Sequence, residues 1–275
     1  MAATPVQKPA TAMSASPPAA RPLAGRHALV TGASRGIGAA IARELARLGA
    51  DLSLVARNTD GLKSVADELR AQTHVAEIAG DMTDERAAMQ AIARAADTLG
   101  TVVILVNNAG GAESAPFVKT DPALWRRMVD LNLTSVYLAT RAVAPAMIAA
   151  RFGRIVNIAS TAGLKGYPYV SAYVAAKHGV VGLTRALALE FAKTGITVNA
   201  VCPGYTDTPM LEDAISTIAA KTGRSADEAR AGLSASNPMG RLVTPAEVAA
   251  AVGWLCLPEA ASVTGQALAV AGGEV

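Results

Sequence analysis

Cysteine, histidine and aromatic residues are scarce in this sequence, and each shortage excludes a class of protein. The 275 residues include two cysteines and three histidines, and aromatic residues make up 4%. Cys202 and Cys256 stand far apart and outside any CxxC pattern, so we expect neither a disulfide framework nor a zinc site. Both lie in apolar runs, which fits small core residues in a protein of the reducing cytoplasm. The histidines share no metal-ligand spacing, and no metal site is expected.

Charge is also low, and no long apolar run is free of charged or turn residues. Charged residues make up 17% of the chain, and the formal net charge of +3 is spread along it. A protein that binds nucleic acid would show a clustered basic stripe, so we expect no such partner. No run of apolar residues is long enough to suggest a membrane span, and none is expected. Hydrophobic residues make up 51%, enough for the core of a globular domain.

The chain divides into a short tail and one long alternating region. Residues 1–25 are dominated by Ala, Pro, Ser and Thr and lack a signal-peptide core, which predicts a disordered tail. Residues 26–275 are predicted to form a single α/β domain. Val- and Ile-rich runs alternate there with helical stretches, which predicts a doubly wound parallel sheet of the Rossmann type with helices on both faces. The predicted strands are 27–31, 52–56, 75–78, 102–106, 154–158 and 197–201.

A glycine-rich turn follows the first predicted strand and opens a helix predicted over 37–48. It reads Thr31-Gly32-Ala33-Ser34-Arg35-Gly36-Ile37-Gly38. Glycines permit a tight turn and let the backbone approach a pyrophosphate, and the free N–H groups at the helix start attract phosphates. The turn therefore predicts a dinucleotide-binding domain.

The end of the second strand favours NADP(H) over NAD(H). A carboxylate there would bind the adenosine ribose of NAD, but Asp51 stands at the start of that strand. The far end reads Val55-Ala56-Arg57-Asn58 instead. The guanidinium groups of Arg57 and Arg35 suit a 2′-phosphate because a planar fork donates two charge-assisted hydrogen bonds. In the alternative interpretation, both arginines are solvated surface residues.

Polar residues at the ends of later strands extend the predicted site, because ligands bind such sheets beyond the carboxyl ends of the strands. Asp81 follows the third strand, Asn107-Asn108-Ala109-Gly110 the fourth, and Ser160 the fifth. Tyr173 and Lys177 are spaced i, i+4 on the next predicted helix and project from one face. An ammonium favours the phenolate form of a nearby tyrosine, so the group suits proton transfer beside a nicotinamide. A Tyr/Lys pair on a helix is otherwise more often a surface pair.

Taken together, these motifs resemble the short-chain dehydrogenase/reductase family from about residue 26 onward. Besides the turn, the resemblance rests on Asn107-Asn108-Ala109-Gly110, Ser160, Tyr173-(x)3-Lys177 and Pro203-Gly204. It implies a catalytic tetrad of Asn132, Ser160, Tyr173 and Lys177, in which Asn132 would hold a water that links Lys177 to solvent. Tyr173 would give its proton to the substrate carbonyl oxygen, Ser160 would hydrogen-bond that oxygen, and Lys177 would lower the tyrosine pKa and hold the nicotinamide ribose.

The glycine-rich turn, the residues at the strand ends and the family resemblance together predict one set of cofactor contacts. Within it, the backbone near Thr206 and the Thr208 side chain would meet the carboxamide. The set comprises Gly32, Ser34, Arg35, Gly36, Ile37, Gly38, Arg57, Asp81, Met82, Asn108, Ala109, Gly110, Tyr173, Lys177, Pro203, Gly204, Thr206 and Thr208.

The region from about 205 to 238 contains two amphipathic stretches and is predicted to form a lid over the substrate. Apolar residues there and nearby either line a substrate pocket or serve as packing; they are Leu164, Tyr167, Tyr205, Met210, Leu211 and Ile215.

The segment from Ala159 to Met210 is similar to ketoreductases of aromatic polyketide synthesis, and it also resembles 3-oxoacyl-thioester reductases and 3-hydroxybutyrate dehydrogenases. The resemblance implies an NADPH-dependent reductase of a 3-oxoacyl thioester or a related β-keto compound, assembled as a homotetramer. One alternative is an NAD(P)-dependent dehydrogenase of a secondary alcohol, 3-hydroxy acid or polyol. A non-catalytic NADP-sensing protein is the other, and the presence of both Tyr173 and Lys177 disfavours it.

Overall fold

The computed structural model describes residues 21–275, and most of the predicted tail lies outside this range. The described residues 21–25 are not a disordered tail. Leu23 is only 1% exposed and belongs to the main core, and its N–H donates to the carbonyl of Leu48 at 2.9 Å. For these five residues the predicted boundary at Gly25 is wrong, because one apolar side chain anchors the segment.

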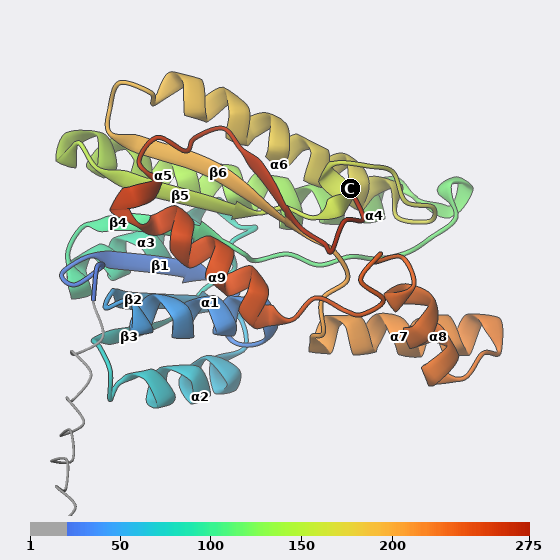
Figure 1. Ribbon diagram of the computed structural model, residues 1–275. Coiled ribbons are helices and arrows are strands. Elements are labelled where there is room, and N and C mark those ends of the chain that lie inside the picture. The colour runs from blue at the N-terminus through green and yellow to red at the C-terminus, as the bar shows by residue number, and fades with distance from the viewer. Residues whose placement is uncertain (1–20) are drawn as a thin grey trace, which may run out of the picture.

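A seven-stranded parallel sheet forms the centre of the protein, in the order β3-β2-β1-β4-β5-β6-β7 (Figure 1). Each neighbouring pair is parallel, and the strand order reverses between β1 and β4. This confirms the doubly wound fold, with its switch point beside the glycine turn. The strands are β1 (His27–Thr31), β2 (Asp51–Ala56), β3 (Val75–Ala79), β4 (Val102–Asn107), β5 (Gly153–Ile158), β6 (Ile196–Pro203) and β7 (Ala267–Val270).

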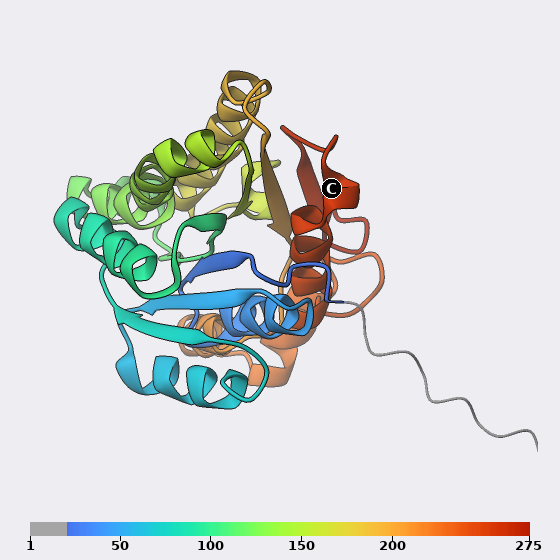
Figure 2. The same ribbon diagram turned by 90° about the vertical axis from the view of Figure 1, so that its left-hand side faces the viewer.

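Helices cover both faces of the sheet (Figure 2). Two hydrophobic clusters pack against the sheet, one on each face, beneath the two layers of helices. The first layer contains α1 (Gly36–Arg47), α2 (Thr59–Leu69) and α9 (Pro245–Cys256). The second contains α3 (Glu85–Leu99), α5 (Ser135–Ala150) and α6 (Ser171–Glu190), with α4 (Pro122–Val129) leading into α5.

A long helical rod, Pro122–Ala150, contains one irregular turn. A π-helical turn, Asp130–Thr134, separates α4 from α5. By length and composition the rod Pro122–Ala150 could cross a membrane, yet 44% of its most apolar window is buried within the protein. Its apolar residues pack on β4 and α3, as expected of a core helix.

The last strand and its preceding helix were not predicted. β7 is only four residues long and reads Ala-Leu-Ala-Val, too short for a clear strand pattern, and α9 is apolar on most of its surface. Both cysteines lie buried and unpaired in the cores of the described chain, as predicted.

The region predicted as a lid folds as two helices, α7 (Pro209–Thr222) and α8 (Ala226–Ser234), beyond the end of β6 (Figure 1). Leu211, Ile215 and Ala229 form a small core between them. These helices therefore have a packing interior of their own, separate from the two cores of the sheet.

Candidate active site

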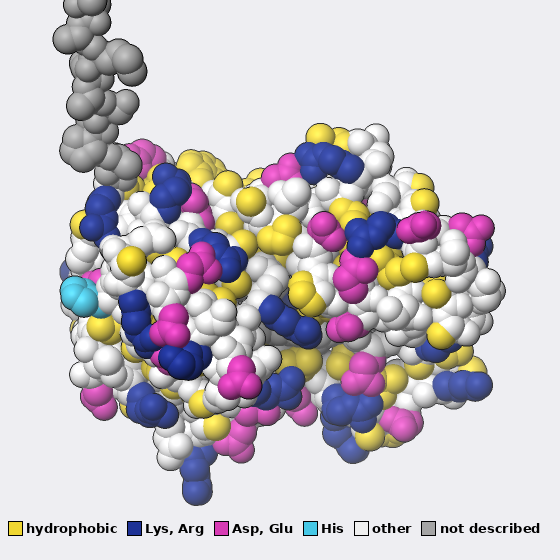
Figure 3. Space-filling model, turned by 90° about the horizontal axis from the view of Figure 1, so that it is seen from below, with side chains coloured by type: hydrophobic (Ala, Val, Ile, Leu, Met, Phe, Trp, Pro, Cys, Tyr) yellow, Lys and Arg dark blue, Asp and Glu magenta, His cyan; other side chains and the backbone are white. Residues whose placement is uncertain are grey.

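A cavity of about 480 Å³ lies at the carboxyl edge of the sheet. Seen from below, the molecule has a hollow with basic side chains in it, while charges of both signs mix over the rest of the surface (Figure 3). Most of the residues predicted from the sequence line the cavity: Gly32, Ser34, Arg35, Gly36, Ile37, Gly38, Arg57, Asp81, Met82, Asn108, Ala109, Gly110, Ser160, Tyr173, Lys177, Pro203 and Thr208.

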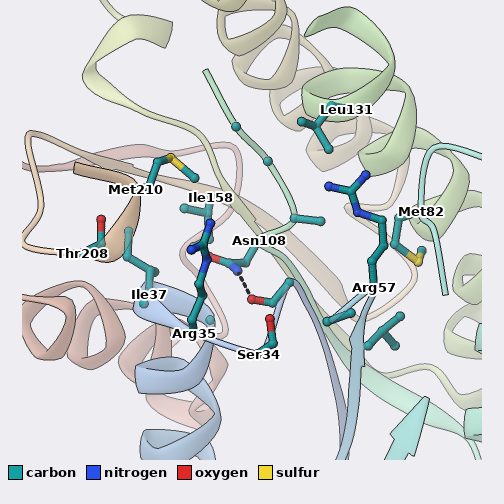
Figure 4. A pocket seen from close by; sticks show the side chains of 18 of the residues that line it. Ser34, Arg35, Ile37, Arg57, Met82, Asn108, Leu131, Ile158, Thr208 and Met210 are labelled. Atoms are coloured by element: carbon teal, nitrogen blue, oxygen red, sulfur yellow. Dashed lines mark hydrogen bonds between the residues drawn. The ribbon is translucent and has the colours of Figure 1, made fainter. Parts of the chain in front are cut away.

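The glycine turn is held in a shape that larger residues could not adopt. Gly32 has φ +66°, a left-handed conformation, and a Cβ on Gly38 would lie 2.3 Å from the Gly32 carbonyl oxygen. Asn108 fixes the turn, because its Nδ2 donates to the carbonyls of Thr31 (2.9 Å) and Gly32 (3.1 Å). Figure 4 shows Asn108 beside the turn. The backbone is thereby exposed to the cavity, as close approach to a pyrophosphate requires.

The start of α1 faces the cavity without a cap. Its N-cap residue, Arg35, makes no side-chain hydrogen bond to the helix, and no acidic residue occurs in the first turn. Elsewhere Asn58, Asp84 and Asp121 cap their helices with side-chain oxygens. Free N–H groups and the positive end of the helix dipole therefore remain for an anion, and the turn fits the phosphates of a dinucleotide.

Two arginines reach toward the cavity from opposite sides (Figure 4). Arg57 follows β2 and makes only a long ion pair, 3.8 Å from Asp81, while its side chain is 71% exposed. Arg35 makes no ion pair within residues 21–275. Burial raises the pKa of Asp81, but hydrogen bonds from Thr83 and the charge of Arg57 outweigh it, so the pKa is lowered overall. Both guanidinium groups are thus available to a phosphate group.

Ser160, Tyr173 and Lys177 converge at the inner end of the cavity. Ser160 follows β5, and the other two residues stand on the first turns of α6. Lys177 is 4% exposed, and its Nζ donates to the carbonyl of Ile158 at 2.7 Å and lies 5.7 Å from the centroid of the Tyr173 ring. Strand β5 therefore positions both the serine and the lysine.

The pKa of Tyr173 does not follow the expectation that Lys177 lowers it. Burial raises the pKa of Tyr173, and the Ser160 hydroxyl opposes this only in part. Burial also lowers the pKa of Lys177 to about 8. The Lys177 ammonium donates to the Ile158 carbonyl and is not among the groups that set the pKa of Tyr173, so desolvation prevails over the hydrogen bond from Ser160. Tyr173 is accordingly a protonated phenol at neutral pH.

Asn132 lies behind the cavity, in the π-helical turn. Its Nδ2 donates to the carbonyls of Gly111 and Met128, each at 2.9 Å, and its Oδ1 accepts from the Gly111 N–H at 3.1 Å. The π turn displaces the helix backbone and aims this amide at the segment after β4. A Cβ on Gly110 would lie 2.9 Å from Asn132 Oδ1 and 3.5 Å from Lys177 Nζ, so the three residues are close neighbours.

Two predicted cofactor residues do not line the cavity. A Cβ on Gly204 would lie 3.0 Å from Glu274 Oε2, so this glycine makes room for another side chain. Thr206 is buried, pairs with Val243 in an isolated bridge, and donates its hydroxyl to the Gly204 carbonyl. Gly204 thus faces the segment after β7, and Thr206 pairs with the segment before α9; the sequence placed neither segment here.

Several residues that line the cavity were not predicted as contacts. Nearly all are sequence neighbours of predicted ones, which is the signal that would have found them: Val55, Ala56, Asn58, Gly80, Thr83, Gly111, Leu131, Ile158, Ala159 and Pro209. Among the suggested substrate residues, Met210 lines the cavity. Leu211 and Ile215 instead pack inside the lid, so they serve as packing residues rather than as part of a substrate pocket.

Comparison with known proteins agrees with this geometry. A family model for short chain dehydrogenases matches residues 26–219. The chain is 46% identical over 267 residues to a protein of Streptomyces violaceoruber named as ketoacyl reductase 1 of the granaticin polyketide synthase, covering 96% of this chain and 97% of that one. It is 43% identical over 250 residues to the cis-4-hydroxycyclohexanecarboxylate dehydrogenase of Sinomonas cyclohexanicum, with 90% and 96% coverage.

A solved structure provides the third comparison. A single-residue variant of the actinorhodin polyketide ketoreductase, crystallised with NADPH, superimposes with a TM-score of 0.87 at 42% identity, covering 90% of this chain and 97% of that one. Fold, strand-end residues and sequence thus agree over most of the described chain. The protein is an oxidoreductase that belongs to the short-chain dehydrogenase family.

Proposed function

We propose that this protein is an NADPH-dependent reductase of a 3-oxoacyl thioester or a related β-keto compound. The observation that carries the proposal is the meeting of a partly buried Tyr173 with Ser160 and Lys177 in the cavity that begins at the glycine turn. Relatives named as polyketide ketoreductases support the substrate class.

The dinucleotide would lie along the carboxyl edge of the sheet. The turn from Gly32 to Gly38 and the start of α1 would hold its pyrophosphate, and Arg35 and Arg57 its 2′-phosphate. Asp81 and Met82 would border the adenine, while Asn108 to Gly110 would lie against the nicotinamide-side ribose. Bound NADPH supplies the hydride. A neighbour solved with NADPH supports this choice over NAD(H).

Tyr173 would act as the general acid. A reductase needs a proton donor at the carbonyl oxygen, and a phenol with a raised pKa stays protonated through the neutral range. Ser160 would hydrogen-bond the same oxygen and stabilise the charge that develops on it. Lys177, fixed on the Ile158 carbonyl, would orient the ribose and place positive charge near the reacting oxygen. Asn132 would hold the Gly110–Gly111 backbone in place.

A second candidate reaction is the oxidation of a secondary alcohol by the same residues in reverse. It is favoured by the 43% identity to a dehydrogenase of a hydroxycyclohexane carboxylate. Its general base would be Tyr173 in the phenolate form. Reduction is the better-supported direction because relatives named as polyketide ketoreductases match at up to 46% identity.

We further propose a homotetramer in the cytoplasm, with neither nucleic acid nor membrane as a partner. Large apolar side chains stand exposed on the helical layers, among them Trp125, Tyr137 and Ile148 along α4 and α5 and Leu189 on α6. Such residues are typical of protein interfaces. Light scattering on the purified protein tests this, and a monomer at micromolar concentration would contradict it.

A substrate panel tests the function itself. Acetoacetyl-CoA, free acetoacetate, a decalone and a polyol would each be assayed with NADPH, NADH and their oxidised forms. The proposal expects acetoacetyl-CoA or the decalone with NADPH to give the highest kcat/KM. Preferred turnover of the polyol with an oxidised cofactor would favour the second candidate instead.

A further inference from the structure

A buried carboxylate lies beside the active site and has no part in the proposed chemistry. Glu274 follows β7, and its side chain is 2% exposed. Its Oε1 accepts from the Tyr167 hydroxyl at 2.5 Å and pairs with Lys165 Nζ at 3.2 Å. Its Oε2 is buried with no partner among residues 21–275. A half-satisfied carboxylate costs free energy to bury, so stability alone does not explain its presence.

Two glycines make room for the close packing around Glu274 and the segment that carries it. Gly272 has φ +60°, and a Cβ there would lie 2.0 Å from Asn237 Oδ1, at the end of the lid. A Cβ on Gly204 would lie 3.0 Å from Glu274 Oε2. The segment after β7 therefore lies between the lid and the residues after β6, and this packing fixes the position of Glu274.

Hydrogen bonds link Glu274 through Tyr167 to Thr161, the neighbour of the catalytic serine, and ring packing links Tyr167 to the lid. The Tyr167 hydroxyl has a single proton and gives it to Glu274, so at the 2.7 Å contact with Thr161 Oγ1 the threonine is the donor. Thr161 directly follows Ser160. The Tyr167 ring meets Tyr205 edge-on, with centroids 6.2 Å apart, and Tyr205 packs on the small core of the lid.

We propose that Glu274 is a positioning residue for the ketone substrate. It holds Tyr167 against Thr161, so that Tyr167 and Tyr205 form a fixed aromatic wall between Ser160 and the lid. This inference rests on the proposed function, because it concerns where the ketone lies relative to Ser160 and Tyr173. A rigid wall at this point selects ketones by shape, with little effect on the cofactor end of the cavity.

Kinetics of Glu274→Ala, Glu274→Gln and a matched control test the wall. The control, Glu259→Ala, removes an exposed glutamate of the 3-10 turn Pro258–Ala260. We expect Glu274→Ala to raise KM for a bulky decalone by about tenfold, the loss of one charge-assisted hydrogen bond. Glu274→Gln keeps an acceptor for the Tyr167 hydroxyl and should raise it by only about threefold. The NADPH Kd and the control should stay unchanged.

Coupling and hydrogen exchange complete the test. Adding Glu274→Ala to Tyr167→Phe should raise KM little beyond Tyr167→Phe alone, because both remove one hydrogen bond. In Glu274→Ala, amides over residues 163–167 should also exchange faster, whether or not any ketone is turned over. Unchanged exchange and KM, or equal losses of ketone and NADPH binding, would overturn the proposal. Faster exchange in a protein that reduces no ketone would show that Glu274 holds Tyr167 in place, and it would reject the proposed function and the role toward a ketone.

Discussion

Replacing Arg57 with alanine should weaken NADPH and leave NADH untouched. A charge-assisted hydrogen bond contributes roughly 1.5–3 kcal/mol. The Arg57 side chain is 71% exposed, so solvent screening favours the low end of that range. A loss of about 1.4 kcal/mol is a tenfold change in binding. The expected result is therefore a fall of about tenfold in kcat/KM for NADPH.

Arg35→Ala should have a similar effect, because this side chain faces the same opening from the other side (Figure 4). If both arginines hold one 2′-phosphate, the double variant should lose less than the product of the two single losses. The assay is kcat/KM with each cofactor at a fixed ketone concentration. Arg94→Ala, an exposed arginine of α3, is the matched control. A wild-type preference for NADH, or equal losses for both cofactors, would refute the assignment.

Three further changes have defined outcomes. Gly38→Ala places a Cβ 2.3 Å from the Gly32 carbonyl oxygen, so NADPH binding measured by fluorescence should be lost, and a Kd within twofold of wild type would contradict this. Burial lowers the pKa of Lys177 to about 8, so its ammonium loses its proton as pH rises through that value. We expect kcat/KM for reduction to fall above about pH 8. A flat profile up to pH 10 would disprove the role of the charge. Asn132→Ala leaves the Gly111 N–H and carbonyl without their hydrogen-bond partner. The free energy of unfolding should fall by about 2 kcal/mol, which lowers Tm by about 4–8 °C. An unchanged Tm would show that the amide is dispensable.

The parallel sheet and the phosphate turn could be predicted because both depend on local signals. Buried strands such as Val102–Asn107 are apolar almost throughout, and the glycine turn occurs between such a strand and a helix. β7 escaped prediction because four small residues carry no such signal, and its place in the sheet depends on pairing with β6. The same is true of Leu23, whose burial depends on a contact with the core.

The site shows the same division between local and distant effects. Tyr173 and Lys177 share a helix face, so their proximity follows from spacing. The pKa of Tyr173 does not follow from spacing, because it depends on how deeply the folded chain buries the phenol. Gly204 was expected at the cofactor, yet it faces Glu274, which lies far along the chain, and spacing could not reveal that contact. Tertiary packing decided each of these cases.

The most direct test of the account is the reduction of acetoacetyl-CoA by NADPH in wild-type protein and in Tyr173→Phe. Phenylalanine fills the same space but has no proton to give, so kcat should fall by about a thousandfold, the contribution of one positioned general acid. NADPH should bind to the variant with a Kd within about twofold of wild type, because the phosphate contacts lie at the other end of the cavity. If the variant retained more than about a tenth of wild-type kcat, Tyr173 would not be the proton donor and the proposed mechanism would be wrong.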